Sequence, residues 1–224
     1  RHGGTAVREL ERAFAELYGV RHAIAVSSGS AAVHTAIAAL DPEPGDEIIT
    51  TPCTDFGTVL GILWQNAIPV FADLDPETLT LDPASVEAQI TPRTRAIVVV
   101  HLFGGLADID GLKAVADRHG IPLIEDCAQA QLSETNGRLA GTIGTLGCFS
   151  LNSTKHLNAG EGGMVITNDD ALARRARLFH DKAWPRDEPD RYSLFLAQNY
   201  RLSELQAAVA LVGLRRLPEN VAAR

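Results

Sequence analysis

One lysine, Lys155, lies in a short segment that also carries hydroxyl groups and a glycine-rich turn. The segment runs from Phe149 to Gly163 and reads FSLNSTKHLNAGEGG. A lysine amine condenses with a carbonyl to form an imine when its surroundings favour the neutral, nucleophilic form. Most lysines are instead solvated surface charges. Lys155 is therefore a candidate nucleophile that needs supporting groups elsewhere in the chain.

Two further groups with suitable chemistry follow short apolar runs. Ser28-Gly29-Ser30 comes after residues 23–26, where backbone N–H groups and hydroxyls at a helix start can hold a phosphate. A serine that only caps the helix is the alternative. Asp126 follows the apolar residues 121–124, so its carboxylate is expected to be partly buried and to need a cationic or hydrogen-bonding partner. A structural cap is again the alternative.

Three other side chains carry weaker signals. Phe56 lies in a turn after another apolar run and can cover a planar ligand by stacking, although such an aromatic is more often part of a core. Ser150 stands five residues before Lys155 and offers a hydroxyl donor, or is a plain turn serine. Gln129 is close to Asp126 in the sequence and can contact the same ligand.

Alternation of apolar runs with helical patterns predicts the framework that positions these groups. The strands are apolar on both faces, which indicates an α/β fold with a mostly parallel sheet covered by helices on each side. Ligands bind such sheets beyond the carboxyl ends of the strands, so residues 27–30, 101–105 and 126–129 should point toward one site. The expected strands are 23–26, 47–50, 69–71, 96–100 and 121–124, and the expected helices are 7–18, 31–40, 58–65, 83–90 and 108–119.

Composition excludes several classes of protein. The chain has 224 residues, of which 46% are hydrophobic and 21% charged, with a net charge of −8. Dispersed basic residues argue against nucleic acid as a partner, and no apolar run approaches the roughly 20 residues that span a membrane. The three cysteines form no CxxC pair and the histidines lack ligand spacing, so no disulfide framework or metal site is expected. Without a signal-peptide pattern, we expect a cytoplasmic protein.

An imine-forming lysine, an anionic partner and a phosphate site are together what pyridoxal 5′-phosphate requires of a protein. The carboxylate of Asp126 would pair with the protonated ring nitrogen, and the turn at 28–30 would hold the phosphate. The separate signals therefore converge on this cofactor.

The order of motifs resembles the DegT/DnrJ/EryC1/StrS family of sugar aminotransferases, which have the aspartate-aminotransferase fold type. The likeness covers nearly the whole chain. It implies a three-layer αβα large domain of a fold-type I pyridoxal-phosphate enzyme. The motifs that carry the resemblance are AVSSGSAA (25–32), PGDEII (44–49), VHLFG (100–104), IEDCAQA (124–130), FS with Lys155 and GEGG (149–163), and NYRLSELQAA (199–208).

The resemblance also implies roles for individual residues. Lys155 would hold the cofactor through an imine, Asp126 would pair with its pyridinium, and Gln129 would contact the side of the ring hydroxyl. The phosphate would be held by Gly29, Ser30 and Ser150, and the ring would be stacked by Phe56.

A homodimer follows from the same resemblance, because Asn199 would reach the phosphate site of a neighbouring subunit. Arg201 would bind an acidic substrate group, with an ion pair inside the dimer as the alternative. Three residues depart from the family pattern: Ser30 replaces threonine, Leu151 replaces an aromatic residue, and Gln198 replaces glycine.

The predicted domain organisation is a cofactor-binding large domain over 1–215 and the start of a connection over 216–224. The resemblance implies that a smaller carboxy-terminal domain, which helps to enclose the substrate, is missing from this chain. Because the first residue is Arg1 and not Met, we also expect a shortened amino terminus.

The expected activity is transfer of an amino group from glutamate or glutamine to a keto sugar, nucleotide-linked in the favoured case, or to a keto cyclitol. Family members that dehydrate sugars have histidine in place of the lysine, so Lys155 favours transamination. The alternatives are a pyridoxal-phosphate-dependent sugar dehydratase and a noncatalytic or regulatory protein that binds the cofactor.

Overall fold

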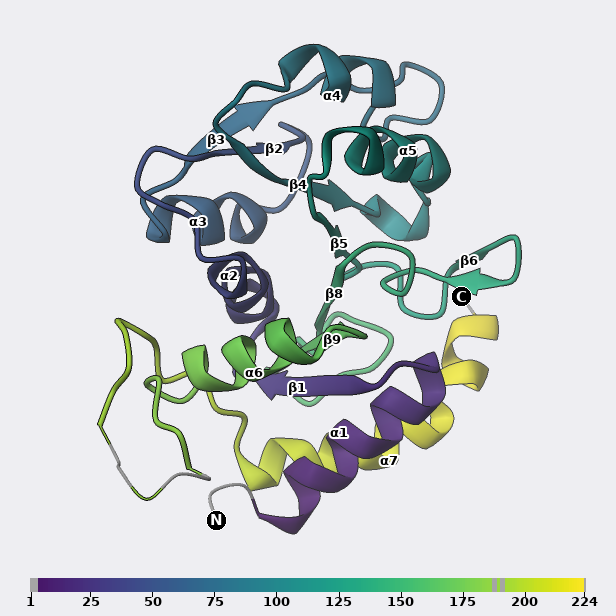
Figure 1. Cartoon of the computed structure of the whole chain (residues 1–224). Helices are drawn as coiled ribbons and strands as arrows, with labels where there is room; N and C mark the ends of the chain where they lie inside the picture. Colours follow the sequence, from purple (N-terminus) through teal and green to yellow (C-terminus); the bar gives the residue numbers. More distant parts are fainter. Residues whose placement is uncertain (1–3, 187–188, 190–191, 224) are drawn as a thin grey trace.

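A seven-stranded sheet forms the centre of the molecule (Figure 1). The computed structural model describes residues 4–186, 189 and 192–223. The strand order is β1-β9-β8-β5-β4-β2-β3, with parallel pairing from β8 to β3, whereas β9 runs antiparallel to both β8 and β1. The sheet is therefore mostly parallel, as predicted. The strands are β1 (His22–Val26), β2 (Glu47–Thr50), β3 (Ile68–Phe71), β4 (Thr94–Val100), β5 (Leu123–Asp126), β8 (Leu146–Ser150) and β9 (Gly163–Thr167).

Helices cover both faces of this sheet. In β4, Val98 packs on one face against a cluster that includes residues of α2 (Gly29–Ala39), α3 (Phe56–Trp64) and α6 (Asp170–Phe179). Its neighbours Ile97 and Val99 pack on the other face with α4 (Pro83–Gln89) and α5 (Ile109–His119). Successive strand side chains point to opposite faces, so both faces must be apolar. The predicted three-layer αβα architecture is confirmed.

Strand β5 is central in this sheet and brings Asp126 to its end. The strand pairs parallel with β4 on one side and β8 on the other, with Asp126 opposite Val100 and Cys148. Parallel strands present their carboxyl ends at one edge, so the segments that follow β4, β5 and β8 leave the sheet together. A short 3₁₀ turn, η1 (Leu102–Gly104), follows β4, and a small hairpin of β6 (Glu134–Thr135) and β7 (Arg138–Leu139) lies between β5 and β8.

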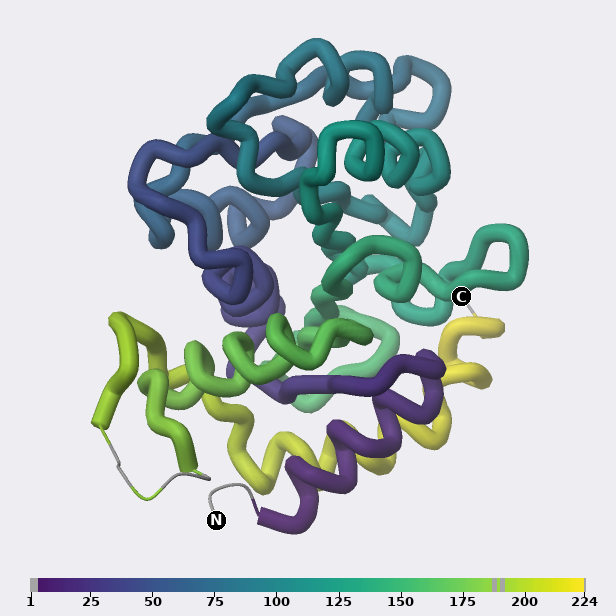
Figure 2. Tube along the Cα trace, in the orientation of Figure 1, coloured from purple at the N-terminus to yellow at the C-terminus, as the bar shows by residue number. Residues whose placement is uncertain are grey.

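The two ends of the described chain pack against each other. Figure 2 shows α1 (Thr5–Tyr18) and α7 (Glu204–Ala222) side by side, although they are far apart in sequence. The Glu204 carboxylate accepts the N–H groups of Ala6 and Val7 at 3.0 and 3.2 Å, where a negative charge favours a helix N-terminus. Leu217 is fully buried in the same core. The predicted domain boundary at residue 215 thus falls inside one helix.

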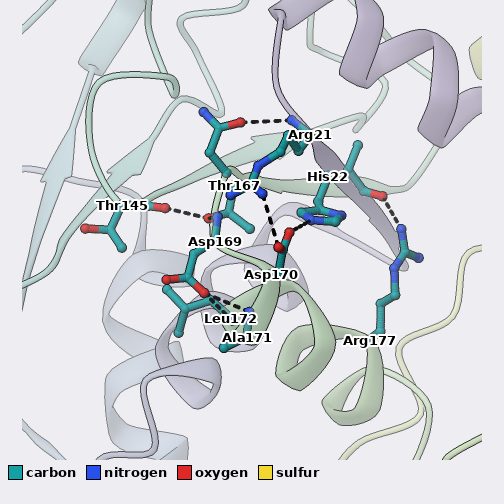
Figure 3. Close-up of polar contacts among 11 residues, drawn as sticks. Arg21, His22, Thr145, Thr167, Asp169, Asp170, Ala171, Leu172 and Arg177 are labelled. Atoms are coloured by element: carbon teal, nitrogen blue, oxygen red, sulfur yellow. Dashed lines mark hydrogen bonds and ion pairs between the residues drawn. The ribbon is translucent and has the colours of Figure 1, made fainter.

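Strand β1, which leads into the serine–glycine turn, is fixed to the N-terminus of α6 (Figure 3). Asp170 accepts from Arg21 at 3.1 Å and contacts the ring of His22 at 2.6 Å. Asp169 caps α6 by accepting the N–H groups of its first turn at 2.8 and 2.9 Å. Arg177, two turns further along α6, donates to the carbonyl of Ala23 at 2.9 Å. These contacts hold the edge of the sheet in place beneath α2.

Among the helices of the described chain, none has the length and apolar character needed to cross a bilayer.

Thr35 of α2 provides a test of the core. Its side chain is fully buried, and its hydroxyl has no hydrogen-bond partner among the described residues. Removing an unsatisfied buried hydroxyl while keeping the shape avoids its desolvation cost. We expect Thr35→Val to raise the free energy of unfolding by about 1 kcal/mol, measured by urea denaturation. The matched change Thr50→Val removes a hydroxyl that donates to the Val98 carbonyl at 2.9 Å and should lower it. A loss of stability in Thr35→Val would contradict this interpretation.

Candidate active site

A cavity of about 360 Å³ opens at the carboxyl ends of the central strands. It lies where β1, β4, β5 and β8 end, together with the first turns of α2 and α3. Six of the residues singled out from the sequence line this one cavity: Gly29, Ser30, Asp126, Gln129, Ser150 and Lys155. The convergence predicted from parallel strand ends is therefore observed.

The N-terminus of α2 forms one end of the cavity. Ser28 caps the helix by accepting the Ala31 N–H at 3.0 Å, so this serine does serve as a cap. The first N–H groups of a helix, here those of Gly29 and Ser30, have no acceptor within the helix. A side chain at Gly29 would put its Cβ 2.7 Å from that of Ser150, so glycine allows α2 to meet the end of β8. Exposed N–H groups beside two serine hydroxyls can hold an anion.

Asp126 is a buried carboxylate, only 6% exposed, in the cavity wall. Burial raises its pKa, because a charged carboxylate is disfavoured away from water. Opposing contributions come from the Thr58 hydroxyl, which donates to Oδ2 at 2.8 Å, and the Ala128 N–H, which donates to Oδ1 at 3.1 Å. The nearby side chains of His101 and Lys155 act in the same direction but do not cancel the effect of burial. This carboxylate is short of a cationic partner.

Next to Asp126, His101 and Glu125 form a buried pair. Glu125 is fully buried and accepts from the N–H groups of Gly141, Ile143 and Gly144 at 2.6–2.8 Å. The Ala107 N–H donates to Nδ1 of His101 at 3.3 Å, so Nε2 carries the proton that is donated to Glu125 at 3.1 Å. Despite its burial, these hydrogen bonds leave the pKa of Glu125 lowered.

Cys127 lies close enough to this pair that the three residues could surround a metal ion. The polar atoms of His101 and Glu125 are already engaged in hydrogen bonds, and burial raises the pKa of the Cys127 thiol far above its usual range. A thiolate is the form that ligates metals. Hydrogen bonding therefore explains this cluster without an ion.

Lys155 is half-buried, in the connection between β8 and β9. Its backbone N–H donates to the carbonyl of Asn152 at 2.9 Å. The side chain of Asn152 accepts from Thr154 at 3.0 Å and donates to Glu161 at 2.7 Å. All four residues line the cavity. The lysine thus lies in a polar turn rather than on an open surface.

Phe56, Asn199 and Arg201 are not among the residues that line this cavity. Asp55 is the N-cap of α3 and accepts the Gly57 N–H at 2.8 Å. This cap places Asp55 and Gly57 in the cavity wall, whereas Phe56 between them is 62% exposed. Phe56 is thus exposed between two residues of the cavity wall, and its stacking on a ring stays a prediction.

Asn199 and Arg201 lie on an extended segment that runs past β1. Asn199 is exposed and pairs through its backbone with Asp181, and Arg201 pairs through its backbone with Val26. The guanidinium of Arg201 is ion-paired with Asp181 and lines a second groove, of about 720 Å³, between α1 and α6. Arg201 therefore has an ion-pair partner, Asp181, within this chain.

Tyr200, between these two residues, points the other way and contacts a buried histidine. His34 of α2 is 1% exposed, and its Nδ1 lies 3.1 Å from the Tyr200 hydroxyl. The amide nitrogen of Gln65 donates to Nε2 at 2.8 Å, so the proton is on Nδ1. The rings of Trp64, Phe179 and Tyr200 surround the imidazole. Segment 199–201 is thus fixed to the helix whose N-terminus forms the anion site.

Sequence reasoning missed several residues of the site. Thr58, whose hydroxyl donates to Asp126, lies in the first turn of α3, the helix that follows β2. A hydroxyl at the start of a helix that follows a strand was a usable signal for a site residue. Asp55, Asn152 and Glu161 also line the cavity, and their polar types alone did not distinguish them from loop residues.

An αβα domain whose cavity joins a lysine, a buried carboxylate and a helix N-terminus defines a class of phosphate-cofactor enzyme domain. Over residues 1–224 the sequence matches the profile of the DegT/DnrJ/EryC1/StrS aminotransferase family. The chain belongs to this family.

Individual relatives agree with this membership. The chain is 46% identical to an L-glutamine:2-deoxy-scyllo-inosose aminotransferase of Streptoalloteichus tenebrarius, over 98% of this chain and 54% of that protein. It is 41% identical to a GDP-perosamine synthase of Caulobacter vibrioides, over 99% and 59%. Among solved structures, DesI in the presence of its TDP-sugar product superposes with a TM-score of 0.88 at 40% identity, over 97% and 54%. The chain spans about half the length of the relatives it matches.

The buried histidine generates a prediction about pH. Burial lowers the pKa of His34 from 6.5 to about 4, so the unfolded chain binds a proton more readily than the folded one. Stability from this group is full above pH 6.5 and is lost as the pH falls toward 4, by about 3 kcal/mol. The free energy of unfolding of His34→Gln, followed by urea denaturation across this range, should lack that component.

The matched control is His119→Gln, which removes an exposed histidine and should keep the pH dependence of the wild type. Equal pH dependence in the wild type and His34→Gln would contradict the role given to burial.

Proposed function

We propose that this chain forms the cofactor-binding part of a pyridoxal-phosphate-dependent aminotransferase that acts on a keto cyclitol or a keto sugar. The observation that carries the proposal is the meeting of Lys155, Asp126 and the N-terminus of α2 in one cavity. Each supplies what one part of the cofactor requires, and family membership supports the same reaction class.

The residues present fit the cofactor in chemical type. The backbone N–H groups of Gly29 and Ser30 and the hydroxyls of Ser30 and Ser150 suit a phosphate. The raised pKa of Asp126 marks a buried carboxylate that a protonated ring nitrogen would satisfy. Gln129 lines the same cavity, and its side-chain oxygen, Oε1, accepts the Phe103 N–H at 2.8 Å. The side-chain NH₂ of Gln129 is left to donate to a ring oxygen.

When bound, pyridoxal phosphate supplies an electron-withdrawing ring that stabilises negative charge at the donor's alpha carbon. The protein's contribution is to hold and move protons. The Lys155 amine would accept the proton from the donor's alpha carbon and, as an ammonium group, would return it to the cofactor carbon bonded to the same nitrogen. The Asp126 carboxylate would keep the ring nitrogen protonated, and the hydrogen bond from Thr58 holds that carboxylate in place.

The proposed acceptor is a polyol ketone. One relative is named for a keto cyclitol and glutamine, and another for a GDP-linked sugar. Polar side chains of Asp55, Asn152, Thr154 and Glu161 around the cavity offer partners for several hydroxyl groups. We propose glutamine or glutamate as the amino donor.

We further propose a cytoplasmic homodimer whose sites are completed by Asn199 of a second copy. Exposed apolar side chains beside the cavity and on the segment before Asn199 support a partner here, because Phe103 is 87% and Leu196 is 93% exposed. The segment before Asn199 carries several such groups, Tyr192, Leu194 and Leu196, and exposed apolar patches are typical of protein contacts.

Covalent capture tests the role of Lys155. Wild-type protein mixed with pyridoxal phosphate and reduced with borohydride should carry the cofactor on the peptide that contains Lys155, as seen by mass spectrometry. Lys155→Ala should lose this adduct, and its conversion of cofactor to pyridoxamine phosphate by glutamine should fall by about 10²–10⁴-fold, the usual contribution of a positioned base.

Lys113→Ala is the matched control, because Lys113 is a surface lysine paired with Asp117 and should leave the adduct unchanged. Wild-type protein that binds the cofactor but forms no adduct at Lys155 would refute the proposal. A tight complex of wild type that never converts the cofactor with any amino acid donor would favour the noncatalytic alternative.

A further inference from the structure

Lys155 lies on a segment without regular secondary structure, so something outside that segment must hold it. The connection 151–162 closes on itself through Leu151 N–H to Gly162 O at 2.8 Å and Ser153 N–H to Gly160 O at 3.0 Å. These bonds join the two sides of the connection near its base. They do not fix the part that contains Lys155 relative to the rest of the domain.

Leu157 is buried in the core, and the side chain of Asn220 donates to the carbonyl of His156 at 3.5 Å. Gln131 adds an attachment on both sides of the lysine. Its Nε2 donates to the carbonyl of Ser150 at 2.7 Å, and its Oε1 accepts the N–H of Leu157 at 2.6 Å. These two partners lie on either side of Lys155, one at the end of β8 and one two residues beyond the lysine. One side chain therefore spans the segment that carries the candidate nucleophile.

The geometry of this bridge allows one orientation. A backbone carbonyl only accepts and a backbone N–H only donates, so the Gln131 amide cannot be reversed without losing both bonds. Gln131 is 2% exposed, and Leu157 is fully buried. Buried polar groups without partners are costly. Because water does not reach this site, the two hydrogen bonds of Gln131 are expected to be kept or lost together.

Gln131 also connects the lysine to the acid of the site. It follows Asp126 by five residues, and the stretch between them includes Gln129, which lines the cavity. A shift of residues 155–157 would therefore be resisted by segment 126–131, which carries the Asp126 carboxylate. This link keeps the Lys155 amine and the Asp126 carboxylate at a fixed separation, which benefits a reaction that uses both.

We propose that Gln131 is a positioning residue, whose buried amide fixes the Lys155 segment against the end of β8 and so sets the approach of the lysine amine to its carbonyl partner. The inference rests on the proposed function in that the partner is pyridoxal phosphate. The clamp itself is a property of the chain and can be measured without cofactor.

Two variants test the clamp. Gln131→Met keeps the length of the side chain and removes both hydrogen bonds. We expect amide hydrogen exchange in residues 151–162 to become about tenfold faster or more, and adduct formation between Lys155 and added pyridoxal phosphate to slow to a similar degree. Leu112→Ala, on the buried face of α5, is the control for general destabilisation and should lower the melting temperature without this local effect.

Gln131→Glu gives a rescue that a general loss of packing would not show. Its carboxylate can accept from Leu157 but cannot donate to Ser150, so near pH 7 it should behave like Gln131→Met. A protonated glutamic acid can make both bonds, and burial favours the protonated form. Protection of residues 151–162, compared with wild type at the same pH, should therefore return as the pH is lowered.

Exchange and adduct formation equal to wild type in Gln131→Met would overturn the inference, as would the same local change in Leu112→Ala. If Gln131→Met does not fold, the exchange of residues 151–162 in Gln131→Glu at lowered pH decides the question. Protection that does not return as the pH is lowered counts against the clamp. Wild-type protein without any adduct at Lys155 would instead refute the proposed function, while the exchange comparison still decides the role of Gln131.

Discussion

Burial of the Asp126 carboxylate at the end of β5 is the constraint on which the arrangement of the site depends. A charged group in that position must be solvated by the protein. Its neighbours come from separate parts of the chain: Thr58 from α3, the Ala128 N–H from the turn after β5, and the nearby side chains of His101 and Lys155. Groups that are far apart in the sequence therefore surround this carboxylate at one cavity.

The cavity also needs close approach between α2 and the sheet. A side chain at position 29 would collide with Ser150. Gly29 therefore allows the helix to approach the strand closely. His34, one turn further along α2, is fixed by Gln65 and Tyr200. The same helix therefore presents its N-terminus to the cavity and anchors segment 199–201 on its other side, which couples the anion site to the part of the chain proposed to reach a second subunit.

Much of this arrangement could be predicted from the sequence. Apolar runs predicted strands β1 to β5 correctly, and the rule that parallel strand ends converge placed Asp126 and Ser28–Ser30 together. Lys155 was joined to them through the needs of the cofactor. The stacking role of Phe56 stays a prediction, because a list of strand ends does not contain the rotation of the helix that its Asp55 cap begins. Strands β8 and β9 were not among the expected strands, and the antiparallel pairing of β9 with β1 is a long-range choice. Gln131 gave no signal, since its role comes from two backbone groups and not from a motif.

The antiparallel pairing of β8 and β9 has a consequence for the order of assembly. These strands pair from Gly147 opposite Ile166 to Ser150 opposite Gly163, so the lysine lies in the connection of a hairpin. The hairpin closes the shortest stretch of chain, 13 to 19 residues, whereas the parallel pairings of β5 close 22 residues to β8 and 26 residues to β4. The segment that carries Lys155 is thus enclosed by the most local of these pairings, and the pairing of β5 with β8 brings Asp126 to it.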